Sequence, residues 1–155
     1  MAEITPEPHF SIRIFQTHAG MRVNRRRLRE AARRVMVGED RFFTIHLILT
    51  DDRELRRLHR VFFGGNQTSD VVTFPAEESG GINEIYVNLE QARRQALEDG
   101  ISLQRAVERL LIHGVLHLTG LQDGTESQRR RMLNLGERYL LTGESPQEKP
   151  PPITV

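Results

Sequence analysis

The sequence of 155 residues contains no cysteine. This absence excludes disulfide bonds, cysteine-ligated zinc, iron–sulfur clusters and cysteine nucleophiles. Any metal ion must therefore be held by histidine, aspartate, glutamate or backbone oxygen atoms. A chain of this length suits one domain, and it can bury a core that folds without a disulfide or a metal.

Long apolar segments are also absent. No stretch approaches the roughly 18 uncharged apolar residues that a membrane-spanning helix needs. The start of the chain, MAEITPEPHFSIRIF, has acidic residues and prolines where a secretory signal peptide has a basic flank and an apolar run. We therefore expect a cytoplasmic protein with no membrane partner.

Lysine is nearly absent, since Lys149 is the only lysine among 22 basic residues and the others are arginines. The planar guanidinium group binds phosphate oxygens in a bidentate way, so this usage fits phosphate recognition. A GC-rich genome that favours arginine codons would explain the same usage without any ligand. The net charge of +1 does not by itself indicate a nucleic-acid-binding protein, but a local basic stripe is enough to bind an RNA backbone.

Hydrophobic periodicity and helix caps predict an α+β fold. The predicted strands cover residues 9–16, 42–50, 70–74 and 83–88, and the predicted helices cover 25–37, 51–63, 88–99, 102–118 and 126–141. The strand 42–50 is apolar almost throughout and should be central, and the helix that follows it should carry Leu55, Leu58 and Val61. A polar turn should join the strands at 74 and 83. We predict one small mixed four-stranded sheet with about five packed helices over residues 1–141, and a proline-rich disordered tail over 142–155.

Two of the six histidines form a metal-ligand pattern. His113 and His117 lie four residues apart in the helix predicted to end before Gly120, so both imidazoles emerge from one face. Glycine permits the left-handed turn that ends a helix, and this turn can swing Asp123 back toward the histidines. Three protein ligands with a fourth position open are typical of a catalytic zinc ion. We predict one divalent ion per chain at the end of this central helix; two incidental histidines beside a turn are the alternative.

The remaining histidines, at positions 9, 18, 46 and 59, stand apart from one another and are expected on the surface or satisfied in the core. Zinc peptidases of the H-E-x-x-H type carry a glutamate general base directly after the first histidine. Gly114 occupies that position here, so peptide hydrolysis would require another glutamate, such as Glu84 or Glu108, to face the metal. Water on the metal, its pKa lowered by the ion, is then the one catalytic group the sequence indicates directly.

The motif around these histidines resembles that of the YbeY family of bacterial rRNA-maturation factors. The family signature H-G-x-L-H-L-x-G-Y-D-H matches HGVLHLTG at residues 113–120. The family's T-D-V-L-S-F-P motif is similar to SDVVTFP at residues 69–75, and its following G-D-I strand is similar to NEI at 83–85. The resemblance covers roughly residues 40–141, and includes the leucine-led helix from Leu58 onward.

After Gly120 the family pattern has tyrosine, aspartate and histidine, whereas this sequence has Leu121, Gln122 and Asp123. Asp123 stands where the family has its third histidine, so an oxygen would replace a nitrogen ligand. We expect Zn²⁺, with Mn²⁺ or Mg²⁺ as alternatives because a carboxylate suits harder ions. Phe63 stands where the family usually has an arginine thought to serve the active site, and Arg60, one helical turn earlier, is a weak candidate to replace that arginine.

The resemblance implies a single-strand-specific, metal-dependent endoribonuclease that matures the 3′ end of the small-subunit rRNA and acts in ribosome quality control. The small ribosomal subunit and its proteins are the implied partners; the oligomeric state is open. Arginines must then bind the RNA backbone, with a solvated outer face as the alternative role for them. The candidates are Arg53, Arg56, Arg57 and Arg60 on the second predicted helix, and Arg25, Arg26, Arg27, Arg29, Arg33 and Arg34 on the first.

Asp70 and Thr73 lie in the second motif, at the two ends of a short predicted strand. They are expected either to shape the cleft wall and orient a ligand histidine or merely to cap the strand and its turn. A second function also remains open. The chain would then be a non-catalytic ribosome-assembly factor whose metal is structural, and the loss of the family arginine at Phe63 favours this alternative.

Overall fold

The computed structural model describes residues 10–79 and 81–141. That part of the chain forms four strands, six α-helices and one π-helical turn. In chain order they are β1 (Ser11–Gln16), α1 (Arg25–Glu39), β2 (Thr44–Thr50), α2 (Asp52–Leu58), the π-helical turn η1 (His59–Phe63), β3 (Val71–Phe74), α3 (Ala76–Ser79), β4 (Asn83–Asn88), α4 (Leu89–Asp99), α5 (Leu103–Leu118) and α6 (Glu126–Leu141).

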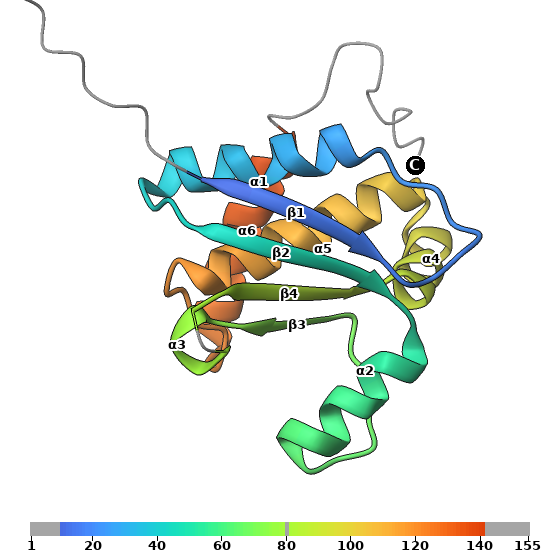
Figure 1. Cartoon of the computed structure of the whole chain (residues 1–155). Coiled ribbons are helices and arrows are strands. Elements are labelled where there is room, and N and C mark those ends of the chain that lie inside the picture. The colour runs from blue at the N-terminus through green and yellow to red at the C-terminus, as the bar shows by residue number, and fades with distance from the viewer. Residues whose placement is uncertain (1–9, 80, 142–155) are drawn as a thin grey trace, which may run out of the picture.

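The four strands form one mixed sheet in the order β1-β2-β4-β3, which confirms the predicted α+β class and sheet. β2 pairs in parallel with both β1 and β4, so it is internal as expected. β3 runs antiparallel to β4 and forms an edge. The parallel pair β1 and β2 is joined through α1, since parallel strands need a crossover connection. Figure 1 shows α1, α5 and α6 gathered along one side of the sheet, and α2 set apart from them.

The main core lies between the sheet and the helices α1, α4, α5 and α6. Strand pairing aligns Ile14, Leu47, Ile85 and Thr73 in one row across the sheet, and the three apolar members of this row are buried in the core. The neighbouring row, Phe15, Ile48, Tyr86 and Val72, points to the opposite face because side chains alternate along a strand. On that face Leu55 and Leu58 of α2 pack with Val72 in a smaller cluster.

Two local predictions differ from the structure. After Leu58 the chain widens into the π-helical turn η1, so Val61 rotates away from the face that carries Leu55 and Leu58, and is 60% exposed. The expected polar turn after β3 contains the single-turn helix α3, where the Ala76 amide donates to Asn83 Oδ1. The predicted tail over 142–155 lies outside the described residues. None of the described helices has the length and apolar character to cross a bilayer.

Candidate metal centre

Helix α5 carries the two histidines and packs against the sheet edge. Its N-cap is Ser102, whose Oγ accepts a hydrogen bond from the Arg105 amide. Gly114 faces the sheet, and a Cβ atom there would lie 2.9 Å from Ile85 Cγ2 and 3.3 Å from Thr73 Cγ2. The absence of a side chain at Gly114 therefore lets α5 lie close to β3 and β4. His113 and His117 consequently emerge beside the edge strand, partly exposed.

The turn after α5 brings a carboxylate back to the histidines. Gly120 adopts a φ of +105°, a conformation that favours glycine. The amide of Leu121 donates to the Leu116 carbonyl at 3.3 Å, which closes the end of the helix and reverses the chain. Asp123 follows two residues later and faces the helix it has just left. The swing of Asp123 predicted from the glycine is therefore present in the structure.

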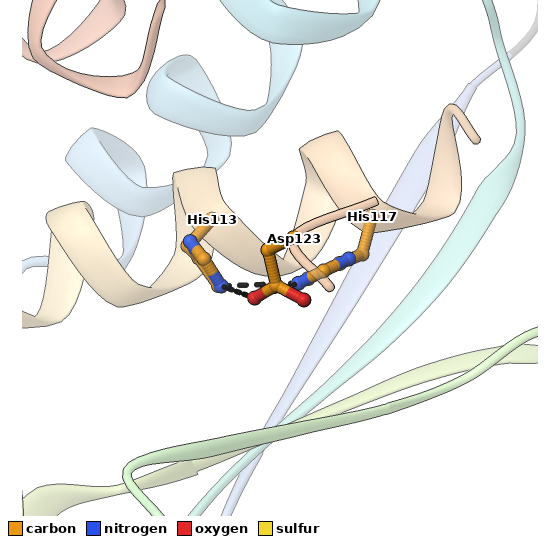
Figure 2. A group of neighbouring side chains, drawn as sticks. All are labelled: His113, His117 and Asp123. Atoms are coloured by element: carbon orange, nitrogen blue, oxygen red, sulfur yellow. Dashed lines mark hydrogen bonds and ion pairs between the residues drawn. The ribbon is translucent and has the colours of Figure 1, made fainter. Parts of the chain in front are cut away.

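Three ligand atoms converge at this turn (Figure 2). Nε2 of His113 lies 3.0 Å from Nε2 of His117. An Asp123 carboxylate oxygen lies 3.3 Å from His117 Nε2 and 3.6 Å from His113 Nε2. All three donor atoms lie within 4.8 Å of one another. Two imidazole nitrogens and one carboxylate oxygen at this spacing can hold a single divalent ion and leave a further position open.

The imidazoles of His113 and His117 lie in surroundings that suit metal ligands. Nδ1 of His117 lies 3.0 Å from the Leu121 carbonyl oxygen, and because a carbonyl only accepts, Nδ1 carries the proton and Nε2 presents its lone pair. Burial, followed by the neighbouring His117, lowers the pKa of His113 and so favours its neutral form. Nε2 of His117 directs its lone pair toward Nε2 of His113, 3.0 Å away. The donor set therefore fits a bound cation.

A cleft of about 390 Å³ opens over these donor atoms. Asp70 and Thr73 are among the residues that line it. Asp70 Oδ2 accepts a hydrogen bond from Gln95 Nε2 at 3.0 Å, and within the described part of the chain neither residue hydrogen-bonds to a candidate ligand. We call this space the histidine cleft. Its lining residues are His59, Phe63, Ser69, Asp70, Val71, Val72, Thr73, His113, His117 and Asp123.

His59 and Phe63 are two of the lining residues that sequence analysis did not assign to the site. His59, expected to be an isolated histidine, hydrogen-bonds through Nε2 to Ser69 Oγ inside the cleft. Phe63, one π-helical turn later, lines the same cleft. A signal was available in the sequence, because Ser69 adjoins Asp70 in the second motif and the turn at Gly64 and Gly65 returns the chain from His59 toward it.

Four arginines of α2 and η1 were expected to bind RNA. Three of them lie together outside the histidine cleft. Arg53, Arg57 and Arg60 line a groove of about 540 Å³ on the sheet face opposite α5, which we call the arginine groove. Its other lining residues are Thr17, Ile48, Thr50, Asp51, Glu54 and Tyr86. Arg56 is exposed on α2 and does not line the groove. Arg60 therefore lies in this groove and is not among the residues that line the histidine cleft.

Two arginines of α1 have structural partners. Arg27 forms an ion pair with the buried carboxylate of Glu108 at 3.0 Å, and Arg34 Nε donates to the Tyr139 carbonyl at 3.3 Å. The other α1 candidates, Arg25, Arg26, Arg29 and Arg33, are exposed. For Arg27 and Arg34, these contacts favour a structural role over RNA binding.

Neither glutamate that could have served a peptidase mechanism lines the histidine cleft. Glu108 is buried against Arg27, on the opposite side of α5 from the candidate ligands. Glu84 accepts a hydrogen bond from the Tyr86 hydroxyl at 3.1 Å on the other face of the sheet. The cleft therefore contains three candidate metal ligands, and none of its lining residues is a glutamate that could act as the base of an H-E-x-x-H peptidase.

Comparison with known proteins finds matches to the same family that the sequence motifs resemble. The family model described as "Endoribonuclease YbeY" matches residues 13–143. The chain is 34% identical over 116 residues to Endoribonuclease YbeY of Chlorobium phaeovibrioides, covering 74% of this chain and 78% of that protein. It is 32% identical over 102 residues to Endoribonuclease YbeY of Aquifex aeolicus, covering 63% of this chain and 68% of that protein.

A solved structure has a similar fold. The solution structure of TM1509 from Thermotoga maritima matches with a TM-score of 0.62 and 24% sequence identity. The match covers 93% of this chain and 99% of the other. The arrangement of sheet and helices described above is therefore shared by both molecules.

Proposed function

This chain belongs to the YbeY family, whose members are metal-dependent endoribonucleases, and on this premise we propose that it cleaves single-stranded rRNA at the centre formed by His113, His117 and Asp123. The substrate of this proposal is the precursor of the small-subunit rRNA 3′ end, and the setting is ribosome maturation and quality control in the cytoplasm. The small ribosomal subunit and its proteins are the proposed partners. The observation that supports the proposal most is the convergence of three ligand atoms within 4.8 Å at an open cleft.

His113, His117 and Asp123 would hold the ion, for which we propose Zn²⁺, with Mn²⁺ or Mg²⁺ accepted because of the carboxylate ligand. A bound ion supplies Lewis-acid polarisation of a phosphoryl oxygen and lowers the pKa of water. The Leu121 carbonyl keeps His117 in the tautomer that presents Nε2. Asp70 and Thr73 shape the wall along which the RNA strand lies.

The shape of the cleft favours a single strand. Its volume of about 390 Å³ lies at the lower end of the range for small-molecule pockets, and it is bounded by the edge strand β3 and by η1. An extended strand can place one phosphodiester over the donor atoms, whereas a duplex keeps its bases stacked and paired inside the helix. We therefore assign single-strand specificity to the dimensions of this cleft.

The arginine groove would bind the RNA backbone outside the histidine cleft. Arg53 and Arg60 form no ion pair with any residue that the structure describes, so their guanidinium groups are available to phosphates. Arg57 is less available because it forms a short ion pair with Glu54. Arg56, exposed on the same helix, can add a phosphate contact at the rim.

The proposal is tested by cleavage of a single-stranded RNA that carries a precursor rRNA 3′ end. Wild type, His117→Ala and the matched control His46→Ala are purified in parallel, since His46 lies on the sheet face opposite the cleft. We expect cleavage by wild type and His46→Ala and none by His117→Ala. Equal cleavage by all three would contradict the proposal and indicate a contaminating nuclease. No cleavage by wild type with metal and ribosomal subunits supplied, but retained subunit binding, would favour a non-catalytic assembly factor.

A further inference from the structure

Three consecutive apolar side chains are exposed on η1. Val61, Phe62 and Phe63 are 60%, 59% and 56% exposed. π-Helical turns are uncommon and occur frequently at functional sites. Of these three residues, only Phe63 lines the histidine cleft. An aromatic ring that is more than half exposed therefore stands in the wall of the cleft that contains the candidate metal ligands.

The Phe63 ring is held in place by its neighbours. Its centroid lies 6.1 Å from that of Phe74, with an interplanar angle of 23°, so the two rings are stacked. The His59 ring lies 5.2 Å from the Phe63 ring and is tilted by 48° to it, and His59 is itself fixed by its hydrogen bond to Ser69. Because two rings fix its orientation, Phe63 can offer its exposed surface to a ligand with little further loss of side-chain entropy.

The row of rings continues beyond the cleft. Phe74 contacts Tyr86 edge to face at a centroid distance of 5.8 Å, and Tyr86 lines the arginine groove. The aromatic row Phe63, Phe74 and Tyr86 therefore connects the histidine cleft with the arginine groove. Aromatic side chains interleaved with basic ones are the usual composition of a surface that binds single-stranded nucleic acid.

We propose that Phe63 is the base-stacking platform of the histidine cleft, on which an unpaired nucleobase next to the cleaved phosphodiester stacks. The inference rests on the proposed function, because it assigns RNA to the same cleft. A phenyl ring cannot bind a phosphate, but it stacks on any base, so this contact selects for an unpaired strand without selecting a sequence. Phosphate and base would then be held by different walls of one cleft.

A protein partner is the other ligand that an exposed apolar cluster can bind. The position of Phe63 favours RNA, since its ring shares a cleft with three candidate metal ligands whereas Phe62 does not. Phe62 is also the matched control. It lies on the same turn, is exposed to the same extent, and contacts Phe74 at 5.0 Å.

The test measures affinity for single-stranded RNA oligomers by fluorescence anisotropy, with a chelator present so that the RNA remains intact. One oligomer is intact, and in a series each position in turn is replaced by an abasic nucleotide, which keeps the phosphate and removes the stacking face. We expect Phe63→Ala to bind the intact oligomer roughly tenfold more weakly than wild type, given the usual strength of base–aromatic stacking. Phe63→Tyr should restore the affinity, and Phe62→Ala should leave it unchanged. One oligomer of the series should lack the base that stacks on Phe63. Wild type and Phe63→Ala should bind this oligomer with equal affinity.

Three results would overturn the inference. Equal affinity of Phe63→Ala and wild type for the intact oligomer would assign the ring to another role, such as a protein contact. An equal loss in Phe62→Ala, or a loss that persists at every abasic position, would indicate a general defect of the turn. If wild type cleaves the precursor RNA but any of these results is obtained, the stacking assignment alone fails; if wild type neither binds nor cleaves RNA, the proposed function fails with it.

Discussion

Gly114 and Ile85 approach each other so closely that a Cβ atom on Gly114 would lie 2.9 Å from Ile85 Cγ2. The contact fixes α5 against β4 one residue after His113 and three residues before His117. It therefore sets the height of both imidazoles above the edge of the sheet. It also explains in packing terms why no glutamate stands beside the first histidine.

The first prediction concerns this contact. We expect Gly114→Ala to destabilise the fold by about 1–3 kcal/mol, because the added methyl overpacks against Ile85 and Thr73. This cost exceeds the gain of about 0.5–1 kcal/mol that alanine brings to a helix interior. Gly136→Ala on α6 is the matched control, since its Cβ would meet Ile112 Cγ2 at an ordinary 4.0 Å. Chemical denaturation should show opposite signs for the two variants, and stabilisation by both would refute the packing argument.

The second prediction concerns the buried pair of Arg27 and Glu108. Arg27→Leu should lower the free energy of unfolding by on the order of 3 kcal/mol at neutral pH, because it leaves a buried carboxylate without its partner. Burial raises the pKa of Glu108, and Arg27 opposes this shift. Since the folded pKa lies above the unfolded one, the protonated group favours folding at low pH, and this contribution is lost as the pH rises through the folded pKa.

The loss in Arg27→Leu should therefore be larger at pH 8 than at pH 5, as measured by denaturant unfolding at both values. Adding Glu108→Gln to the variant should recover much of the loss and remove its pH dependence. Arg29→Leu, at an exposed position on the same helix, should have little effect. A loss that is equal at both pH values would contradict the assignment to Glu108.

The third prediction concerns the salt dependence of RNA binding. Each phosphate contact contributes about 0.7 to the slope of log affinity against log salt for a single strand. Arg53→Gln and Arg60→Gln should each reduce the slope by roughly this amount, whereas Arg131→Gln on α6 should not change it. Titrations of one oligomer over a range of salt concentrations measure the slope. A slope that neither groove variant changes would remove the arginine groove from the RNA path.

The fourth prediction concerns the oxygen ligand. Asp123→His should shift metal preference toward Zn²⁺ over Mn²⁺ by roughly tenfold, because imidazole suits zinc and carboxylate suits harder ions. Competition titrations with the two ions measure this ratio. Asp123→Ala should weaken both ions and leave their ratio closer to that of wild type. An unchanged ratio in Asp123→His would show that Asp123 does not contact the metal.

The features that sequence analysis predicted are those set by local signals. The predicted helices 25–37 and 102–118 are capped by Asn24 and Ser102, whose side chains accept hydrogen bonds from amides three residues later. His113 and His117 share a face because helical geometry alone puts them there. Asp123 returns because Gly120 ends the helix with a positive φ.

The features that were missed depend on contacts distant in sequence or on an irregular turn. Glu108 meets Arg27 across 81 residues, and no local pattern pairs them. Regular helix periodicity placed Val61 with Leu55 and Leu58, but the π-helical turn adds a residue and exposes it. The same turn directs His59 and Phe63 into the histidine cleft and Arg60 into the arginine groove.

The most direct test of the central claim is a metal titration of the chelator-stripped full chain, with stoichiometry determined by calorimetry and by metal analysis after dialysis. Wild type and the control His46→Ala are compared with the double variant His113→Ala/His117→Ala. The account predicts one Zn²⁺ per chain in the first two and none in the double variant under the same conditions. Binding of zinc by the double variant with unchanged stoichiometry, or no binding by wild type, would contradict it.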